Sequence, residues 1–271
     1  MTQPFVASLP MYNLPEMQPA NRAFWQALLG LLVKEGLSDL PAELAFSRLP
    51  VPDAIGTDVV FTQTCGYPLQ TIYRGQHEMV GVPTYDAPGC GAATHCAFIL
   101  VRDDSPFRSL PDLRGSVFAL NSRHSNSGMN LPRRLLADIA GGKPFFREVV
   151  ETGSHNASIE RVMTGSTDSA SIDNLTYTFL QDYRPAAVEG LRVLAETPPS
   201  PAIPFITAAS RTPEEIAAIR RAILKMPTEP QAQDALRALR IANITPADPQ
   251  AYQVLLRYEA EAAALGYPEL A

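Results

Sequence analysis

The stretch Ser-Arg-His-Ser-Asn-Ser-Gly-Met-Asn-Leu-Pro-Arg-Arg, residues 122–134, follows the strand-like residues 116–120 and leads directly into a helix. N–H groups at a helix start carry partial positive charge, and small hydroxyl residues beside them can complete a pocket for a phosphate-like or carboxylate anion. The alternative is an ordinary capping turn, because Ser and Asn favour helix N-caps whatever the function. Arg133 and Arg134 are predicted to be solvated charges on the helix face and not a phosphate clamp.

A second turn of the same kind follows later in the chain. The strand-like residues 146–151 end in Thr152-Gly153-Ser154-His155-Asn156, and an amphipathic helical pattern begins there. Two anion-type turns in one α/β unit indicate a single oxyanion site.

Strand-like and helical segments alternate along most of the chain, which predicts an α/β fold with mainly parallel sheets. Both anion turns fall between about residues 100 and 200, so a second α/β lobe is expected there. The N-terminal and C-terminal parts are expected to fold together as the first lobe. The predicted division is residues 1–95 and 205–271 for lobe 1 and residues 96–204 for lobe 2.

The composition excludes several classes of partner. The chain has 271 residues, of which 46% are hydrophobic and 18% charged, and its formal charge is −6. An acidic chain is a poor match for nucleic acid or an anionic membrane. No apolar run approaches the roughly 20 residues that span a bilayer, so direct membrane insertion is not expected. The first ten residues lack the pattern of a signal peptide, so the expected location is periplasmic if a leader has been removed and otherwise cytoplasmic.

The three cysteines form no CxxC pair, and three thiols cannot close a structural zinc site, so no metal is expected. Cys65 and Cys90 both lie in glycine-containing turns. A disulfide between them would fit an oxidising compartment, and three reduced cysteines are the alternative. Cys96 lies in an apolar strand and is expected to be a buried thiol.

Three motifs taken together resemble the PhnD-like family, the phosphate-, phosphite- and phosphonate-binding receptors of ABC transporters. They are residues 62–68 (Thr-Gln-Thr-Cys-Gly-Tyr-Pro), residues 125–128 (Ser-Asn-Ser-Gly), and the segment from Glu151 to Asp173. The resemblance runs from about Phe5 to Ala222. It implies a type II periplasmic-binding-protein fold, in which two α/β lobes are joined by two crossing strands and the ligand lies in the cleft. The crossings would fall near residues 94–102 and 198–207, and the implied partner is the permease of an ABC transporter.

The resemblance also implies a set of ligand-binding residues. The oxyanion turn of the family corresponds to Ser125, Asn126 and Ser127, and its anion-binding histidine to His155. Asp173 resembles an acid that can meet a ligand's ammonium group, although Asp173 could equally cap the next helix. The first lobe would contribute Tyr12, Thr64 and Tyr67.

The implied function is non-enzymatic capture of a small oxyanion (a phosphonate, phosphite or phosphate-like ion) by lobe closure, with no cofactor and no catalytic residue. One alternative is an enzyme that uses Ser127 or Ser154 with His155, or Cys65 with His155. The chain has no Gly-x-Ser-x-Gly elbow to support a serine nucleophile. A further alternative is a ligand sensor or a thiamine-precursor-type relative on the same fold.

Overall fold

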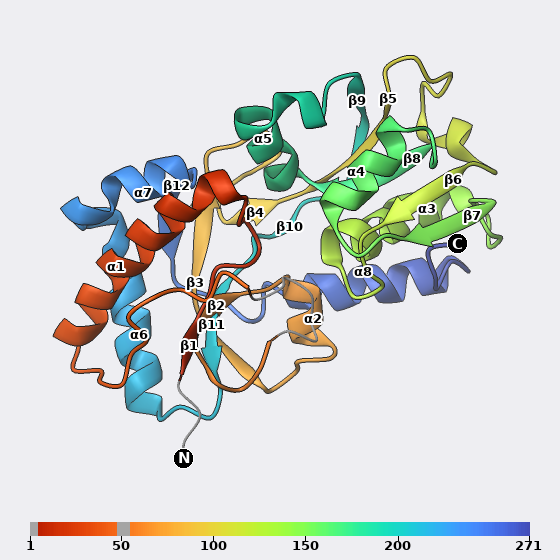
Figure 1. The fold of residues 1–271 in the computed structure, drawn as a ribbon. Coiled ribbons are helices and arrows are strands. Elements are labelled where there is room, and N and C mark those ends of the chain that lie inside the picture. The colour runs from red at the N-terminus through yellow and green to blue at the C-terminus, as the bar shows by residue number, and fades with distance from the viewer. Residues whose placement is uncertain (1–4, 48–54) are drawn as a thin grey trace. The chain divides into compact units, whose positions relative to one another are not determined.

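The computed structural model describes residues 5–47 and 55–271 (Figure 1), and these form two compact units. Unit 1 contains the described residues up to Asp86, then Gly91–Ala93 and Ala202–Gln250. Unit 2 contains Ala87–Cys90, Thr94–Pro201 and Ala251–Ala271.

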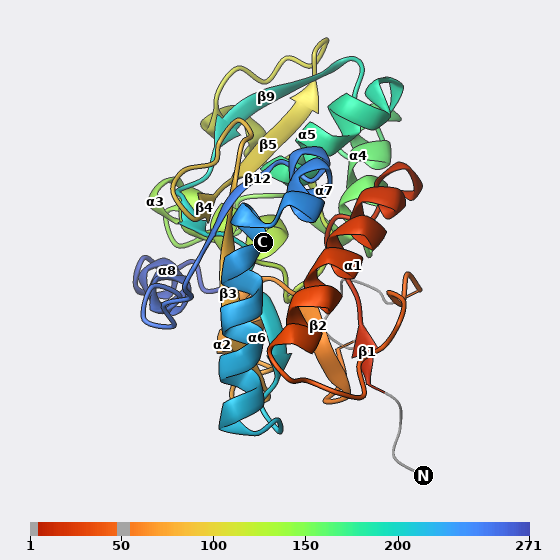
Figure 2. The same cartoon turned by 90° about the vertical axis from the view of Figure 1, so that its left-hand side faces the viewer.

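Unit 1 is built on a five-stranded sheet in the order β1-β2-β11-β3-β12. Its strands are β1 (Val6–Ala7), β2 (Val59–Gln63), β3 (His77–Tyr85), β11 (Phe205–Ala208) and β12 (Ile241–Thr245). Its helices are α1 (Gln18–Lys34), α2 (Gly66–Gln70), α6 (Pro213–Lys225) and α7 (Gln233–Ala238), with short 3₁₀ turns at Pro15–Met17, Met226–Thr228 and Pro230–Ala232. Helices α1 and α6 run side by side, and α6 packs on β3 (Figure 2).

The core of unit 1 forms because the apolar residues of α1 recur at helical spacing and face the sheet. Phe24 of α1 is fully buried and stacks on Phe205 of β11, with ring centroids 5.6 Å apart. Phe61 of β2 stacks on Phe205 at 5.1 Å.

Unit 2 is built on a five-stranded sheet in the order β7-β6-β8-β5-β9. Its strands are β5 (Ala97–Arg102), β6 (Val117–Leu120), β7 (Glu148–Glu151), β8 (Ser169–Asp173) and β9 (Leu191–Glu196). A separate antiparallel pair consists of β4 (Thr94–His95) and β10 (Ser200–Pro201). The helices are α3 (Leu131–Ala140), α4 (His155–Met163), α5 (Asn174–Tyr183) and α8 (Gln253–Ala264), with 3₁₀ turns at Leu110–Leu113 and Pro185–Ala187 and the π-helical turn η4 (Asn126–Asn130).

The sheets are mixed, whereas the sequence predicted mainly parallel order. Strand β1 runs parallel to β2, and β6 runs parallel to β7 and β8. Strand β5 is antiparallel to both neighbours, and so is β11. Two parallel neighbours in one sheet need a crossover connection, which is usually a helix. Strands β5 and β11 lack such a connection, because each follows a point where the chain enters the unit from the other one, after residues 93 and 201.

The chain changes units after residues 93 and 201, near the two expected crossings. It also changes units after residues 86 and 90, on either side of the short segment Ala87–Cys90, and again after residue 250. The prediction placed residues 205–271 in lobe 1. Residues 251–271 instead belong to unit 2, because α8 packs on α3 and on η4.

Candidate functional site

The turn after β6 has an unusual local structure that its sequence explains. Ser125 caps the turn, and its Oγ accepts the Gly128 N–H at 3.0 Å. The Asn130 N–H bonds the Ser125 carbonyl at 3.1 Å, which is the wide i to i+5 spacing of a π-helical turn. Regular helix then begins at Leu131, immediately before Pro132, as a proline in the first turn requires.

The carbonyl of Ser127 is satisfied from outside the helix. Pro132 has no N–H, and the Leu131 N–H bonds Asn126, so the following residues of the helix leave this carbonyl without a donor. The hydroxyl of Ser171, on strand β8, donates to it at 2.6 Å. The turn is therefore fixed to the centre of the unit 2 sheet.

The donors of this turn fall into two groups. The N–H groups of Asn126 and Ser127 lie in the first turn of η4, where no preceding helical carbonyl can accept them. The Asn126 side chain, by contrast, is used internally. Its Nδ2 donates to Ser200 Oγ at 3.0 Å, and its Oδ1 accepts from Asn130 Nδ2 at 3.3 Å. The backbone of Asn126 can serve a ligand, and its amide links the turn to β10.

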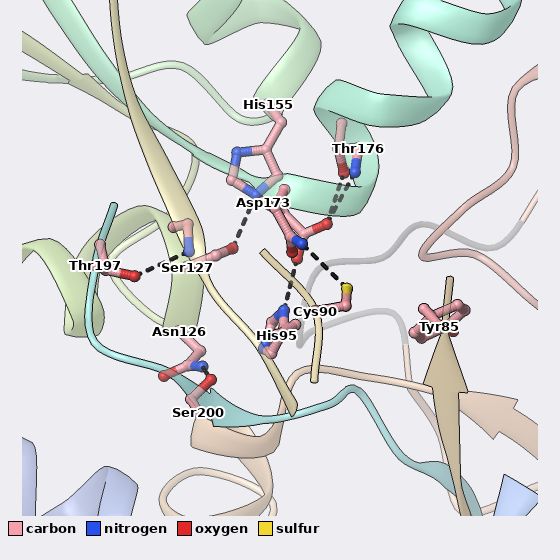
Figure 3. A network of polar contacts seen from close by, with 12 residues as sticks. Tyr85, Cys90, His95, Asn126, Ser127, His155, Asp173, Thr176, Thr197 and Ser200 are labelled. Atoms are coloured by element: carbon pink, nitrogen blue, oxygen red, sulfur yellow. Dashed lines mark hydrogen bonds and ion pairs between the residues drawn. The ribbon is translucent and has the colours of Figure 1, made fainter. Parts of the chain in front are cut away.

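The second turn brings a histidine to the first. Ser154 caps α4, because its Oγ accepts the Ala157 N–H at 3.1 Å. His155 is then the first residue of α4, and its Nε2 lies 3.0 Å from Ser127 Oγ (Figure 3). The two turns thus meet at one place.

His155 is neutral at physiological pH in this structure. Burial, the largest cause, lowers the pKa of His155 to about 4, against the opposing effect of the Asp173 carboxylate. Its second ring nitrogen, Nδ1, is buried and has no hydrogen-bond partner among the described residues. A neutral ring can still donate one hydrogen bond to an anion.

Asp173 ends β8 and is 2% exposed. Its Oδ1 caps α5 by accepting the Thr176 N–H at 2.9 Å, and its Oδ2 lies 3.0 Å from His95 Nδ1 (Figure 3). Burial alone would raise the pKa of Asp173, but the hydrogen bond and charge of His95 bring it below the usual value. The sequence left open whether Asp173 meets a ligand or caps a helix, and in the structure it does cap the helix.

Sequence reasoning missed His95. It is 1% exposed, lies in β4, and pairs with a residue 78 positions away. Its location within the predicted crossing region was the available signal, since a buried polar residue at such a point needs a partner.

The predicted residues of unit 2 come together as one polar region. They are Ser125, Asn126, Ser127, His155 and Asp173. Arg133 was predicted to be solvated, and this was wrong. It is 4% exposed and donates to Asn130 Oδ1 at 2.6 Å and to the Pro268 carbonyl at 3.1 Å. Arg133 therefore joins Asn130, the last residue of η4, to the C-terminal segment.

The predicted residues of unit 1 are all buried. The Tyr12 ring meets the Tyr85 ring edge-on at 5.7 Å, and the Tyr85 hydroxyl accepts from Gln63 Nε2 at 3.3 Å. Thr64 follows Gln63 and is fully buried, with no partner for its hydroxyl among the described residues. Tyr67 is 5% exposed in the first turn of α2.

The structure holds all three cysteines as thiols, and a disulfide between Cys65 and Cys90 stays a prediction. The sulfur of Cys90 accepts from Asn174 Nδ2 at 3.1 Å. Burial raises the pKa of Cys96 to about 12, which fits the expected buried thiol.

Two absences hold for residues 5–47 and 55–271. No group of three or more His, Cys, Asp or Glu side chains is arranged to hold a metal ion. No helix in the same part of the chain combines the length and apolar character needed to cross a bilayer.

Residues 57–252 match the sequence family described as ABC transporter, phosphonate, periplasmic substrate-binding protein. Among curated proteins, none matches the chain in sequence.

Solved structures show the same fold. A binding-protein component of an ABC phosphonate transporter from Pseudomonas aeruginosa has a TM-score of 0.76 at 16% identity, covering 97% of this chain and 88% of that chain. PhnD1 from Prochlorococcus marinus, in complex with methylphosphonate, has a TM-score of 0.63 at 13% identity over 96% and 99% of the chains. A Xanthomonas citri protein bound to ATP has a TM-score of 0.68 at 18% identity over 97% and 98%. The expected type II periplasmic-binding-protein fold is confirmed.

Proposed function

Because this chain belongs to the family of periplasmic substrate-binding proteins of phosphonate ABC transporters, we propose that it binds a small phosphonate-type oxyanion at the η4 turn and releases it unchanged to a transporter permease. The observation that carries the proposal is the convergence of Ser127 Oγ and His155 Nε2, 3.0 Å apart, beside the N–H groups of Asn126 and Ser127, which begin η4 and have no preceding helical carbonyl to accept them. The family supports the periplasm as the working compartment, which cell fractionation with an antibody would check.

The donors suit a tetrahedral oxyanion. An oxyanion can accept from the Asn126 and Ser127 N–H groups and from the Ser127 hydroxyl at once, and the partial positive charge of a helix start favours it. The residues at this turn offer neutral donors, so the anion would be held by directed hydrogen bonds more than by a counter-charge. Ser125 contributes by shaping the turn, because its hydroxyl is occupied by the Gly128 N–H.

The same serine and histidine could be read as a catalytic pair, but two features oppose catalysis. A general base needs a third group to orient it, and His155 Nδ1 has no hydrogen-bond partner among the described residues. A pKa of about 4 also makes His155 a weak base at neutral pH. These features support binding without chemistry.

The test is a titration with methylphosphonate, phosphite and phosphate by calorimetry and thermal shift. Dimethyl methylphosphonate is the control, since it keeps the skeleton and has no anionic oxygen. We expect the anions to raise the melting temperature by mass action and the ester to leave it unchanged. Phosphorus NMR of the recovered ligand should show no new species, and a new phosphorus species would indicate an enzyme.

Ser127→Ala and Ser125→Ala form a matched pair of variants. Loss of the Ser127 hydroxyl should weaken anion binding by roughly 1–3 kcal/mol while the unliganded protein stays near wild-type stability. Loss of the Ser125 cap should instead cost about 1 kcal/mol of stability. If Ser127→Ala leaves anion affinity unchanged, the turn is structural and the proposed site is wrong.

A further inference from the structure

The pair of His95 and Asp173 is the most deeply buried titratable pair in the described part of unit 2, and nothing in the proposed function uses it. The side chains of His95 and Asp173 are 2% and 3% exposed, and Nδ1 and Oδ2 are 3.0 Å apart. Both oxygens of the carboxylate have partners, because Oδ1 also accepts from Thr176 N at 2.9 Å and from Thr176 Oγ1 at 3.3 Å.

His95 lies beside the oxyanion turn. In the antiparallel pair of β4 and β10, His95 is directly opposite Ser200, so their side chains share one face. Ser200 accepts the hydrogen bond from Asn126, the first residue of η4. Figure 3 shows His95 between Asp173 and the pair formed by Asn126 and Ser200.

The imidazole has one polar atom left over. Since Nδ1 faces a carboxylate, it carries a hydrogen, and Nε2 has no hydrogen-bond partner among the described residues. Nε2 is not one of the fully buried side-chain atoms that lack a partner, so this nitrogen is open to solvent or to a ligand. Beside the Asp173 carboxylate, the ring can form a charge-assisted hydrogen bond between Nε2 and an oxygen of an anion.

We propose that His95, held by Asp173, is a second histidine of the ligand site, and that it makes the site prefer oxyanions without an amino group. Its Nε2 bonds an oxygen of the bound anion. An ammonium group needs a carboxylate acceptor, and the oxygens of Asp173 are engaged by His95 and Thr176. The ligand class is therefore phosphite and simple alkylphosphonates, in preference to aminoalkylphosphonates. This inference rests on the proposed function.

The test uses methylphosphonate and 2-aminoethylphosphonate as probes in calorimetry. The wild-type protein should bind methylphosphonate at least about tenfold more tightly than 2-aminoethylphosphonate. A tenfold ratio corresponds to the loss of one charged contact by the ammonium group. His95→Asn keeps a donor near Asp173 and removes Nε2, so it should lose roughly tenfold to a hundredfold in methylphosphonate affinity. His95→Gln places an amide where Nε2 was and should recover part of that loss.

Asp173→Asn gives a second variant, because Asn remains a good N-cap for α5 while it removes the counter-charge of His95. It should weaken methylphosphonate binding and reduce the preference over 2-aminoethylphosphonate. A purely structural role for the pair would lower the melting temperature without changing the ratio of the two affinities.

The outcomes separate the two proposals. Binding of neither probe nor phosphite by the wild-type protein would overturn the proposed function and this inference together. Tight methylphosphonate binding that a folded His95→Asn variant retains would overturn the inference alone, and so would a wild-type preference for 2-aminoethylphosphonate. If His95→Asn does not fold, unchanged affinities and ratio in Asp173→Asn and His95→Gln overturn the inference.

Discussion

The packing around the η4 turn can be tested by the substitution Gly128→Ala, which adds one methyl group next to Asn121. A Cβ at this position would lie 1.8 Å from Asn121 Oδ1 and 3.2 Å from Ser125 Oγ. Such contacts essentially never fall below 3.0 Å, so Gly128→Ala must displace Asn121, η4, or both by more than 1 Å. Overpacking of this kind costs about 1–3 kcal/mol.

The displacement should also reach the second turn. The backbone carbonyl of Asn121 accepts the Gly153 N–H at 3.0 Å, one residue before the Ser154 cap of α4. A shift of the Asn121 backbone, as opposed to a rotation of its side chain, would change the distance between Ser127 and His155. We expect Gly128→Ala to lower the melting temperature by several degrees and to weaken methylphosphonate binding by about tenfold or more.

A second substitution provides the control. Asn121 Oδ1 accepts no hydrogen bond from the described residues, so Asn121→Ala alone should cost little. The double variant Asn121→Ala/Gly128→Ala removes the clash and should recover most of both losses. Thermal unfolding and calorimetry measure the two effects. Wild-type behaviour of Gly128→Ala, or no recovery in the double variant, would refute the packing argument.

Three further predictions concern the same unit. Ser171→Ala should destabilise the protein by about 1–3 kcal/mol, because it leaves the buried Ser127 carbonyl without a donor; a loss below about 0.5 kcal/mol in urea unfolding would contradict this. The pKa of His155 is lowered on folding from 6.5 to about 4, so the unfolded chain takes up the proton first as pH falls. The free energy of unfolding should therefore fall by about 3 kcal/mol as the pH drops from 6.5 to 4, and His155 should have no effect on the pH dependence above pH 6.5. An equal pH dependence in His155→Gln would argue against this. All three cysteines should titrate as thiols in denatured, unreduced protein, and Cys96 should react last in the native protein because it is 3% exposed with a pKa of about 12; a single reactive thiol after denaturation would point to a disulfide.

The local parts of the site could be predicted because they depend on residues close in sequence. A polar turn between a strand and a helix was enough to predict both anion turns, and Ser127 and His155 do meet. The ligand-binding role of these residues stays a prediction.

The long-range parts could not be predicted in this way. The contact between His95 and Asp173 depends on how β4 is placed against β8, which the composition of neither segment encodes. The antiparallel direction of β5 and β11 was missed for a similar reason, since each strand follows a point where the chain re-enters a unit. Arg133 was misjudged because its helix face is covered by a segment more than a hundred residues later.

That covering segment sets the order in which the binding turn can mature during synthesis. Asn130 donates to the Leu255 carbonyl, and Arg133 joins Asn130 to Pro268. The ribosome makes residues 202–250, which belong to unit 1, before it makes residues 251–271, which belong to unit 2. A nascent chain that stops at residue 250 therefore has the η4 turn without these contacts, and the turn gains its full set of contacts only when the last 21 residues have been made.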